Sequence, residues 1–431
     1  SWWLANTGAG SSFYDFEIEN SLLFNGSGGL RFNSGEANTS YWTLSVWVKR
    51  HKLGGNYSTI MSATNYGGTY STDVIGFDSA NTMFSIRGSN GSSFTSSSGN
   101  AIVRDKSNWY HYHLRNNNGT VTRTLNGVVD GTYSVSGTFI GIGRSGNHDI
   151  GAYGGSSESY TNNFSLAEFY FINDSGFDAD DVYDYTQFAE FKNGVLVPKE
   201  NTLTASEIGD GGWYYEFKQT GDNADASGVG ADSSGNNHHA SIIGTISAHC
   251  RATVDTPTNN FATYNVSTGH SSTTMSESNL RALANASGNI LEAQSSTIGV
   301  TSGKWYAEFR ADDLVNDTQN NGTQIGVTTN PYGRSSSNQN GSISGNTRLN
   351  LDQSGGAYLG IDTSLTQQGS VGSYADGDII GVALNADDSE VSFYKNGSAI
   401  TNAQDASITN ENGVYFFEIQ VRKYDGDTSQ I

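Results

Sequence analysis

The sequence predicts an all-β protein with two β-sandwich domains and one short helix. Of its 431 residues, 53 are glycine and 12% are aromatic, while only 3 are proline and 22 are lysine or arginine. Short stretches of alternating apolar and polar residues follow one another, and turns rich in glycine, asparagine and serine separate them. This pattern is typical of antiparallel strands that bury one face against a second sheet.

The first alternating series runs from Leu22 to Ile172. Its clearest strand is 42–49, where Trp, Leu and Val at every second position give one apolar face. Asn126-Gly127 marks a hairpin, because a type I′ turn needs positive φ at both central residues. Further strands of the series are expected at 73–77, 83–87, 109–114, 121–125, 139–142 and 166–172.

Residues 178–191 are the best candidate for the short helix. Asp178 stands near its start and Lys192 at its end, which suits the helix dipole, and Asn193-Gly194 would stop it. After it, residues 213–217 predict a strand that completes the first sandwich. A second alternating series follows a long polar tract, with strands expected at 305–309, 324–327, 357–361, 379–384, 390–394 and 414–421.

These patterns predict four segments along the chain. They are an N-terminal arm at 1–20, a first sandwich at 21–220, a linker at 221–250 and a second sandwich at 251–431. The arm contains Trp2 and Trp3, which either pack on a neighbouring strand or anchor the chain to a partner protein.

The net charge of −21 limits the partners that the protein can bind. A strongly acidic surface repels phosphate backbones, so neither nucleic acid nor an anionic membrane surface is an expected ligand. No apolar run approaches the length of a membrane helix, and no membrane insertion is expected. Cys250 is the only cysteine, so the chain forms no internal disulfide.

The sequence predicts no cofactor and no transition-metal site. His238 and His239 are neighbours, which point to opposite faces of a strand, and His111 and His113 lack a third ligand. Loop calcium stays an alternative, since carboxylates are its preferred ligands. Two acidic clusters could supply them, although neither matches an EF-hand loop: Asp178, Asp180 and Asp181, and Asp312, Asp313 and Asp317.

No enzyme motif stands out. A sandwich glycosidase needs carboxylates on one face of a strand, and the nearest such string, 15–19, lies in the predicted arm. Neither a nucleophile elbow nor a phosphate-binding loop is present. We therefore expect a non-enzymatic protein, with a glycoside hydrolase as the less favoured alternative.

Aromatic residues in polar loops indicate a ligand site on the first sandwich. The candidate ligand-binding residues are Tyr66, Tyr70 and Tyr153, together with His148 and Asp149, which are close to Tyr153 in sequence. Sugars stack on aromatic rings while polar side chains bond their hydroxyls. The predicted ligand is a neutral or weakly charged glycan, and loop packing is the alternative role for the rings.

Several longer motifs carry a family resemblance. Stretches 22–32, 42–50, 108–111, 125–127, 166–172, 232–237 and 254–261 resemble a large family of marine tailed-phage structural proteins, many of them from cyanophages. The first block is similar to a laminin-G or concanavalin-A-like lectin module. The last third resembles a SPRY module through 302–308, 377–384 and 393–397.

The resemblance implies a virion structural protein, most often a tail-fibre or other external appendage subunit, with no catalytic residues to carry over. Its expected partners are other virion proteins, a host-surface glycan and further copies of the chain, with a trimer preferred. A head-fibre or decoration subunit and a secreted glycan-binding protein are the alternatives. Two features depart from the family: Asn237-His238-His239 replaces the usual Asn-aromatic pair, and similar proteins continue beyond Ile431.

Overall fold

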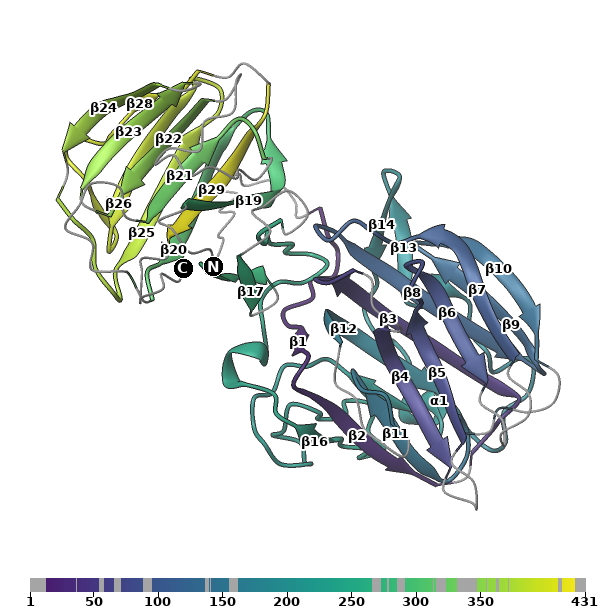
Figure 1. Ribbon diagram of the computed structural model, residues 1–431. Coiled ribbons are helices and arrows are strands. Elements are labelled where there is room, and N and C mark those ends of the chain that lie inside the picture. Colours follow the sequence, from purple (N-terminus) through teal and green to yellow (C-terminus); the bar gives the residue numbers. More distant parts are fainter. Residues whose placement is uncertain are drawn as a thin grey trace. The chain divides into compact units, whose positions relative to one another are not determined.

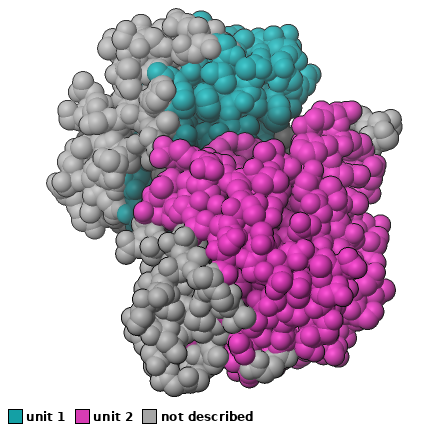
Figure 2. All heavy atoms as spheres, turned by 90° about the vertical axis from the view of Figure 1, so that its right-hand side faces the viewer, with its two compact units in different colours: residues 1–9, 261–431 teal, residues 10–260 magenta. Residues whose placement is uncertain are grey.

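The polypeptide divides into two units, one of residues 10–260 and one that combines residues 261–431 with residues 1–9 (Figure 2). The predicted anchors Trp2 and Trp3 lie outside the described residues. A computed structural model describes residues 13–35, 37–53, 58–65, 71–87, 95–135, 139, 141–154, 162–265, 273–276, 279–284, 291–312, 314, 323–331, 347–353, 355–361, 364–370, 372–409 and 413–422.

The first sheet of residues 10–260 has the strand order β1-β12-β3-β8-β9-β10, and β15 also pairs with β12 (Figure 1). All of its pairs are antiparallel. Its strands are β1 (Leu22–Asn25), β3 (Tyr41–Arg50), β8 (Trp109–Asn117), β9 (Thr120–Leu125), β10 (Val128–Ser134), β12 (Asn163–Ile172) and β15 (Trp213–Tyr215).

The second sheet has the order β16-β2-β11-β4-β5-β6-β7 and is also antiparallel. Its strands are β2 (Gly28–Ser34), β4 (Ser58–Asn65), β5 (Ser71–Phe77), β6 (Thr82–Arg87), β7 (Thr95–Ile102), β11 (Gly146–Ile150) and β16 (Ser241–Gly244).

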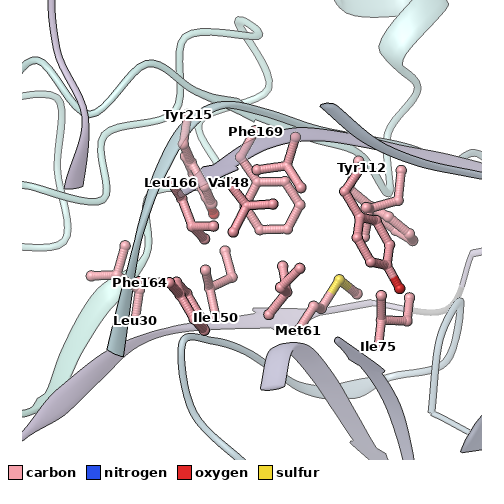
Figure 3. Close-up of a cluster of buried hydrophobic side chains, with 14 of the residues drawn as sticks. Leu30, Val48, Met61, Ile75, Tyr112, Ile150, Phe164, Leu166, Phe169 and Tyr215 are labelled. Atoms are coloured by element: carbon pink, nitrogen blue, oxygen red, sulfur yellow. The ribbon is translucent and has the colours of Figure 1, made fainter. Parts of the chain in front are cut away.

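The core of this unit lies between the two sheets, as the alternating pattern predicts. Val48 and Tyr112 point inward from the first sheet and meet Met61, Ile75 and Ile150 from the second (Figure 3). All five side chains are buried. Burial of apolar area between two facing sheets is what stabilises a sandwich. The predicted all-β sandwich fold is therefore confirmed.

A third layer of chain covers the outer face of the first sheet. Phe188 and Ile208 pack there on Tyr170 and Tyr214. The elements of this cover are the 3₁₀ helix η1 (Tyr185–Gln187), the hairpin strands β13 (Ala189–Lys192) and β14 (Val195–Pro198), and helix α1 (Ala205–Ile208).

The helix predicted at 178–191 does not form. Asp178 and Asp181 instead accept backbone hydrogen bonds within a turn, a local alternative that competes with helix formation. Asn193-Gly194, with φ values of 52° and 82°, closes the β13–β14 hairpin rather than a helix. The short helix is α1, where Thr204 and Glu207 form a capping box.

The stretch 221–250, expected as a linker, packs into the first unit. Its strand β16 pairs with β2, and Val229, Ile246 and Cys250 join the core between the sheets. Apolar residues spaced through a polar tract are sufficient to fix such a segment on a sheet. The short 3₁₀ helix η2 (Ala248–Cys250) ends it.

The chain enters and leaves this unit side by side. Ser21 and Thr253 form an antiparallel bridge, with N–H···O distances of 2.8 and 2.9 Å between their backbones. Farther along, the backbone N–H of Ile18 donates to the Thr258 hydroxyl at 2.9 Å. Lys49, whose side chain is fully buried, forms a 2.8 Å ion pair with Asp255.

The second unit is also built from two antiparallel sheets, with a buried core that includes Ile325, Val382, Phe393 and Ile419. One sheet is β19 (Leu291–Val300), β29 (Tyr415–Arg422), β21 (Gln324–Thr328), β22 (Thr347–Asp352), β23 (Gly356–Ile361) and β24 (Ser364–Ser370) in that order. The other is β20 (Lys304–Arg310), β25 (Ile379–Asn385), β26 (Glu390–Lys395) and β27 (Ser398–Ala399), with β28 (Ala406–Ser407) also on β26. A separate hairpin pairs β17 (Thr274–Ser276) with β18 (Arg281–Leu283).

No helix among the described residues is long and apolar enough to cross a membrane.

Candidate functional site

Strand β11 separates an apolar face from a polar one. His148 and Ile150 point into the core, where the His148 ring lies 5.5 Å from that of Trp213. Because neighbouring side chains alternate in a strand, Asn147 and Asp149 point to the outer face of the second sheet. This outer face is the candidate site.

Two polar rows cross the strands on the outer face. In one row, Ser241, Arg31, Asp149 and Ser62 are consecutive partners in the strand register. In the other, Asn33, Asn147, Thr64 and Thr72 are consecutive partners. Side chains on directly opposed residues of one face lie within contact distance, so each row forms a continuous polar strip.

Arg31 and Asp149 form a bidentate ion pair at the centre of this face. Arg31 Nε donates to Asp149 Oδ1 at 2.6 Å, and Nη2 donates to Oδ2 at 2.8 Å. The side chain of Asp149 is only 1% exposed and that of Arg31 is 21% exposed. The fork geometry fixes both side chains and cancels their charges where a ligand would approach.

A short loop after β11 folds back over the same strands. The Gly154 N–H donates to Ser62 Oγ at 2.8 Å, and Ser62 Oγ donates to the Ala152 carbonyl at 3.0 Å. A Cβ on Gly154 would stand 2.2 Å from Asp149 Oδ2, so a side chain there would collide with the ion pair. These contacts fix Gly154 on the polar rows, and the residue before it, Tyr153, is 41% exposed.

We call Arg31, Asn33, Asn147, Asp149 and Tyr153 the polar face. At its rim, Asn33 Nδ2 donates to Asn147 Oδ1 at 3.0 Å, and Asn33 is exposed. An exposed aromatic ring can stack on the C–H face of a sugar, and side-chain amides can bond the sugar hydroxyls.

The predicted site residues do not all lie on the same face of the sheet. Tyr153 is exposed and precedes Gly154, which lies close to Asp149 Oδ2, and Asp149 is held in the ion pair, so we assign both residues to the polar face. His148 does not, because its ring is buried on the opposite side of β11, where burial lowers its pKa to about 4. Tyr66 and Tyr70 lie outside the described residues.

Three residues of the polar face were missed by sequence reasoning: Arg31, Asn33 and Asn147. Neither β2 nor β11 was among the strands expected from the sequence, and the two strands are 118 positions apart in the chain at the Arg31–Asp149 pair. Register between such distant strands is set by the packed sheet and cannot be read from either strand alone.

Glu168 is the centre of a second polar cluster, which is sealed from solvent. Its φ of 49° lies in the left-handed region, at a break in the register of β12. The hydroxyls of Tyr214 and Tyr170 donate to its carboxylate at 2.6 and 3.1 Å. Burial raises the pKa of Glu168 to about 7. Because the cluster lies under the third layer, it ties β15 to β12 rather than facing a ligand.

The side chains considered as metal ligands do not come together in one site. Within the described ranges, no three His, Cys, Asp or Glu side chains gather as a metal site. His111 Nε2 is bonded to Ser45 Oγ at 2.8 Å, and His113 Nε2 lies 3.2 Å from the Tyr183 carbonyl. Asp312 pairs with Arg310, whereas Asp313 and Asp317 are not among the described residues.

His238 and His239 hold a loop of the first unit in place. His238 Nδ1 lies 2.8 Å from the Gly212 carbonyl, and its ring stacks on Phe32 with centroids 4.6 Å apart. His239 Nδ1 accepts the backbone N–H of Asp232 at 2.9 Å.

Comparison with protein families identifies both units. Residues 24–175 match the Concanavalin A-like lectin/glucanases superfamily, and residues 304–420 match the SPRY domain. The first unit therefore contains a lectin-like jelly roll of the laminin-G and concanavalin-A type. The second contains a SPRY jelly roll, so both modules expected from the sequence motifs are present.

Solved structures are similar to one or both units. Domains LG4-5 of mouse laminin alpha1 align at 9% identity over 96% of this chain and 85% of theirs, with a TM-score of 0.32. The SAP-like pentraxin of Limulus polyphemus aligns at 16% identity over 36% of this chain and 77% of its own, with a TM-score of 0.28.

The SPRY domain of human HERC1 aligns at 17% identity over 36% of this chain and 88% of its own, with a TM-score of 0.29. No curated protein sequence matches the chain.

Proposed function

We propose that the protein is a non-enzymatic structural subunit of a tailed-phage appendage, and that it attaches the particle to a host-surface glycan through the polar face. The observation that carries the glycan-binding part is an outer sheet face of a lectin-like jelly roll that presents the Asn33–Asn147 amide pair. The loop with the exposed Tyr153 is hydrogen-bonded to Ser62 of the same face.

The charge of the polar face favours a neutral sugar. The Arg31 guanidinium is held by Asp149 through two hydrogen bonds, so little positive charge is left for an acidic ligand. The net charge of −21 on the chain further opposes polyanionic sugars. One ring and a few hydrogen bonds give weak single-site binding, with a Kd of about 1 mM, which many copies on one particle would strengthen by avidity.

The absence of hydrolysis is part of the proposal. Glycoside hydrolysis uses two carboxyl groups on either side of the scissile bond. Asp149 is buried in a pair with Arg31, which keeps it from acting as the free acid or base that this chemistry requires.

The virion location rests on the sequence motifs that resemble phage structural proteins, such as 22–32 and 254–261. In this proposal the protein lies outside the host cell, and its partners are other virion proteins and further copies of itself. Electron microscopy of the parent particle with this subunit labelled tests the location. A label on no part of the particle would reject it.

Glycan binding is tested with the full chain on an array of neutral and acidic glycans, displayed at high density to allow avidity. Tyr153→Ala and Asn33→Ala should each weaken binding to the neutral glycans by about tenfold, the loss of roughly one good contact. Asn117→Ala is the matched control, because Asn117 lies on β8 in the other sheet. Equal binding by all three variants, or no binding by the unaltered chain, would reject the site.

A further inference from the structure

Lys49 lies near the end of β3, and its side chain is fully buried. Its Nζ donates to two side chains of the segment that leaves the first unit, Asp255 Oδ2 and Asn260 Oδ1, each at 2.8 Å. A lysine amine, a side-chain amide and a carboxylate therefore meet at one point. This set contains a nucleophile, a carbonyl carbon and a group that can transfer protons between them.

The amide of Asn260 is held at both of its polar atoms. Its Nδ2 donates to the Ser107 carbonyl at 2.7 Å, while its Oδ1 accepts from Lys49. The carbon Cγ is one C=O bond, about 1.2 Å, beyond Oδ1, so it lies within about 4 Å of Lys49 Nζ. A small rotation of the amide brings Cγ to about 3–3.5 Å from Nζ, the separation at which nucleophilic attack begins.

Asp255 is placed between the amine and solvent, with both carboxylate oxygens bonded. Oδ2 accepts from Lys49 Nζ, and Oδ1 accepts the indole N–H of Trp109 at 3.1 Å. Trp109 is the register partner of Lys49 on β8. The Trp109 ring belongs to an apolar cluster with Trp47 and Ile18. The carboxylate is therefore fixed beside the amine, and its side chain is only 12% exposed.

The surroundings favour the neutral amine that an attack on a carbonyl carbon needs. Burial lowers the pKa of Lys49, and the nearby carboxylates of Asp255 and Asp105 offset only part of this effect. Transfer of one proton from Lys49 to Asp255 replaces a buried ion pair by two neutral groups, which burial penalises less. The amine then carries the lone pair that makes it a nucleophile.

We propose that Lys49 and Asn260 form an intramolecular isopeptide bond. The Lys49 amine attacks Cγ of Asn260, the bond from Nζ to Cγ forms, and the bond from Cγ to Nδ2 breaks. Asp255 accepts a proton from the amine and donates one to Nδ2, which leaves as ammonia. Of the three protons on the Lys49 ammonium, one stays in the new amide and one leaves with the ammonia. The third remains on Asp255 or converts the ammonia to ammonium, so no other reactant is needed.

The bond would join β3 to the last residue of the first unit, 211 positions farther along the chain. A pull on the chain beyond Asn260 would then reach β3 through a covalent bond rather than through the hydrogen bonds between Ser21 and Thr253. As with a disulfide, closure of a long loop also restricts the unfolded chain. This strengthening does not depend on whether the unit binds a glycan.

Mass spectrometry of the full chain tests the proposal. The intact mass should be lower than the mass of the sequence by one ammonia. Trypsin should release peptide 32–50 joined to peptide 252–281, because the linked Lys49 resists cleavage. Asn260→Ala and Lys49→Met should each give the two peptides unlinked. Lys52→Met is the matched control, since Lys52 is an exposed lysine close by in sequence, and it should keep the linked pair.

Asp255→Asn keeps the size of the side chain but removes the proton carrier. In freshly synthesised protein sampled over time, this variant should form the linked pair about a hundredfold more slowly or not at all. An equal rate would overturn the role of Asp255. Circular dichroism verifies that each variant is folded, and the result for the unaltered chain is decisive even where a variant does not fold.

The proposal is overturned if the unaltered chain keeps its full sequence mass after prolonged incubation in the folded state. Loss of one ammonia without the linked peptides also overturns it, because an Asn-Gly succinimide has the same mass. Loss of one water, with Lys49 joined to Asp255, overturns the assignment of Asn260 as the reacting group.

Discussion

The hydroxyl of Tyr214 on β15 donates a 2.6 Å hydrogen bond to the carboxylate of Glu168 on β12. The bond forms at the point where the neighbour of β12 changes. Leu166 pairs with Leu22 of β1, and Phe169 pairs with Tyr215 of β15. Glu168 lies in the gap between these pairs with a positive φ, which a non-glycine residue adopts only when its surroundings compensate.

This geometry predicts a pH-dependent stability of the first unit. Burial raises the pKa of Glu168 to about 7, so the folded state favours the protonated carboxyl. The resulting stability is present in full below the pKa of the unfolded chain and is lost as pH rises through about 7. The free energy of unfolding should fall by about 2–3 kcal/mol between pH 5 and 8, and Glu168→Gln should abolish this fall.

Urea unfolding followed by tryptophan fluorescence across this pH range measures the effect. Glu207→Gln is the control, because Glu207 is exposed. Parallel pH profiles for the unaltered chain and Glu168→Gln would contradict the prediction.

The contribution of His148 to stability has the opposite pH dependence to that of Glu168. Burial lowers its pKa to about 4, so its stability contribution is present above the unfolded pKa and is lost as pH falls from about 6.5 to 4. His148→Phe keeps a ring beside Trp213 and Phe171 and cannot be protonated. As pH falls over that range, the free energy of unfolding of this variant should decrease by about 2–3 kcal/mol less than that of the unaltered chain. Thermal melts measure the difference. An identical acid loss in both proteins would exclude His148 as its cause.

Arg31→Met should destabilise the first unit by about 2–3 kcal/mol. The substitution removes the two guanidinium hydrogen bonds to the buried Asp149 carboxylate, and removal of one member of a buried ion pair is strongly destabilising. Lys192→Met breaks the ion pair with the exposed Asp15 and should lower the free energy of unfolding by less than about 0.5 kcal/mol. Urea midpoints at neutral pH compare the two. Equal effects would show that the Arg31–Asp149 pair contributes little.

Gly154→Ala should move the loop that carries Tyr153. The new Cβ would collide with Asp149 Oδ2, so glycan binding should fall while the β-sheet signal in circular dichroism stays unchanged. Gly35→Ala meets nothing within 4 Å and serves as the control. Full glycan binding by Gly154→Ala would show that the position of Tyr153 is unimportant.

Local signals in the sequence predicted much of the fold. The predicted Asn126-Gly127 turn adopts positive φ at both residues, as a type I′ hairpin requires, and the structure shows the same backbone at Asn396-Gly397. The helix expected at 178–191 does not form, because the side chains of Asp178 and Asp181 accept hydrogen bonds from backbone N–H groups in a turn. The polar face could not be predicted in full, since it depends on the register between β2 and β11.

The bridge between Ser21 and Thr253 makes the lectin-like unit suitable for grafting. Its two chain ends leave from neighbouring positions, so a surface loop of an unrelated scaffold could accept the whole unit without being stretched. Recombination between genes could exchange such a unit as one cassette, and the receiving protein would gain the polar face while its own fold stayed unaltered.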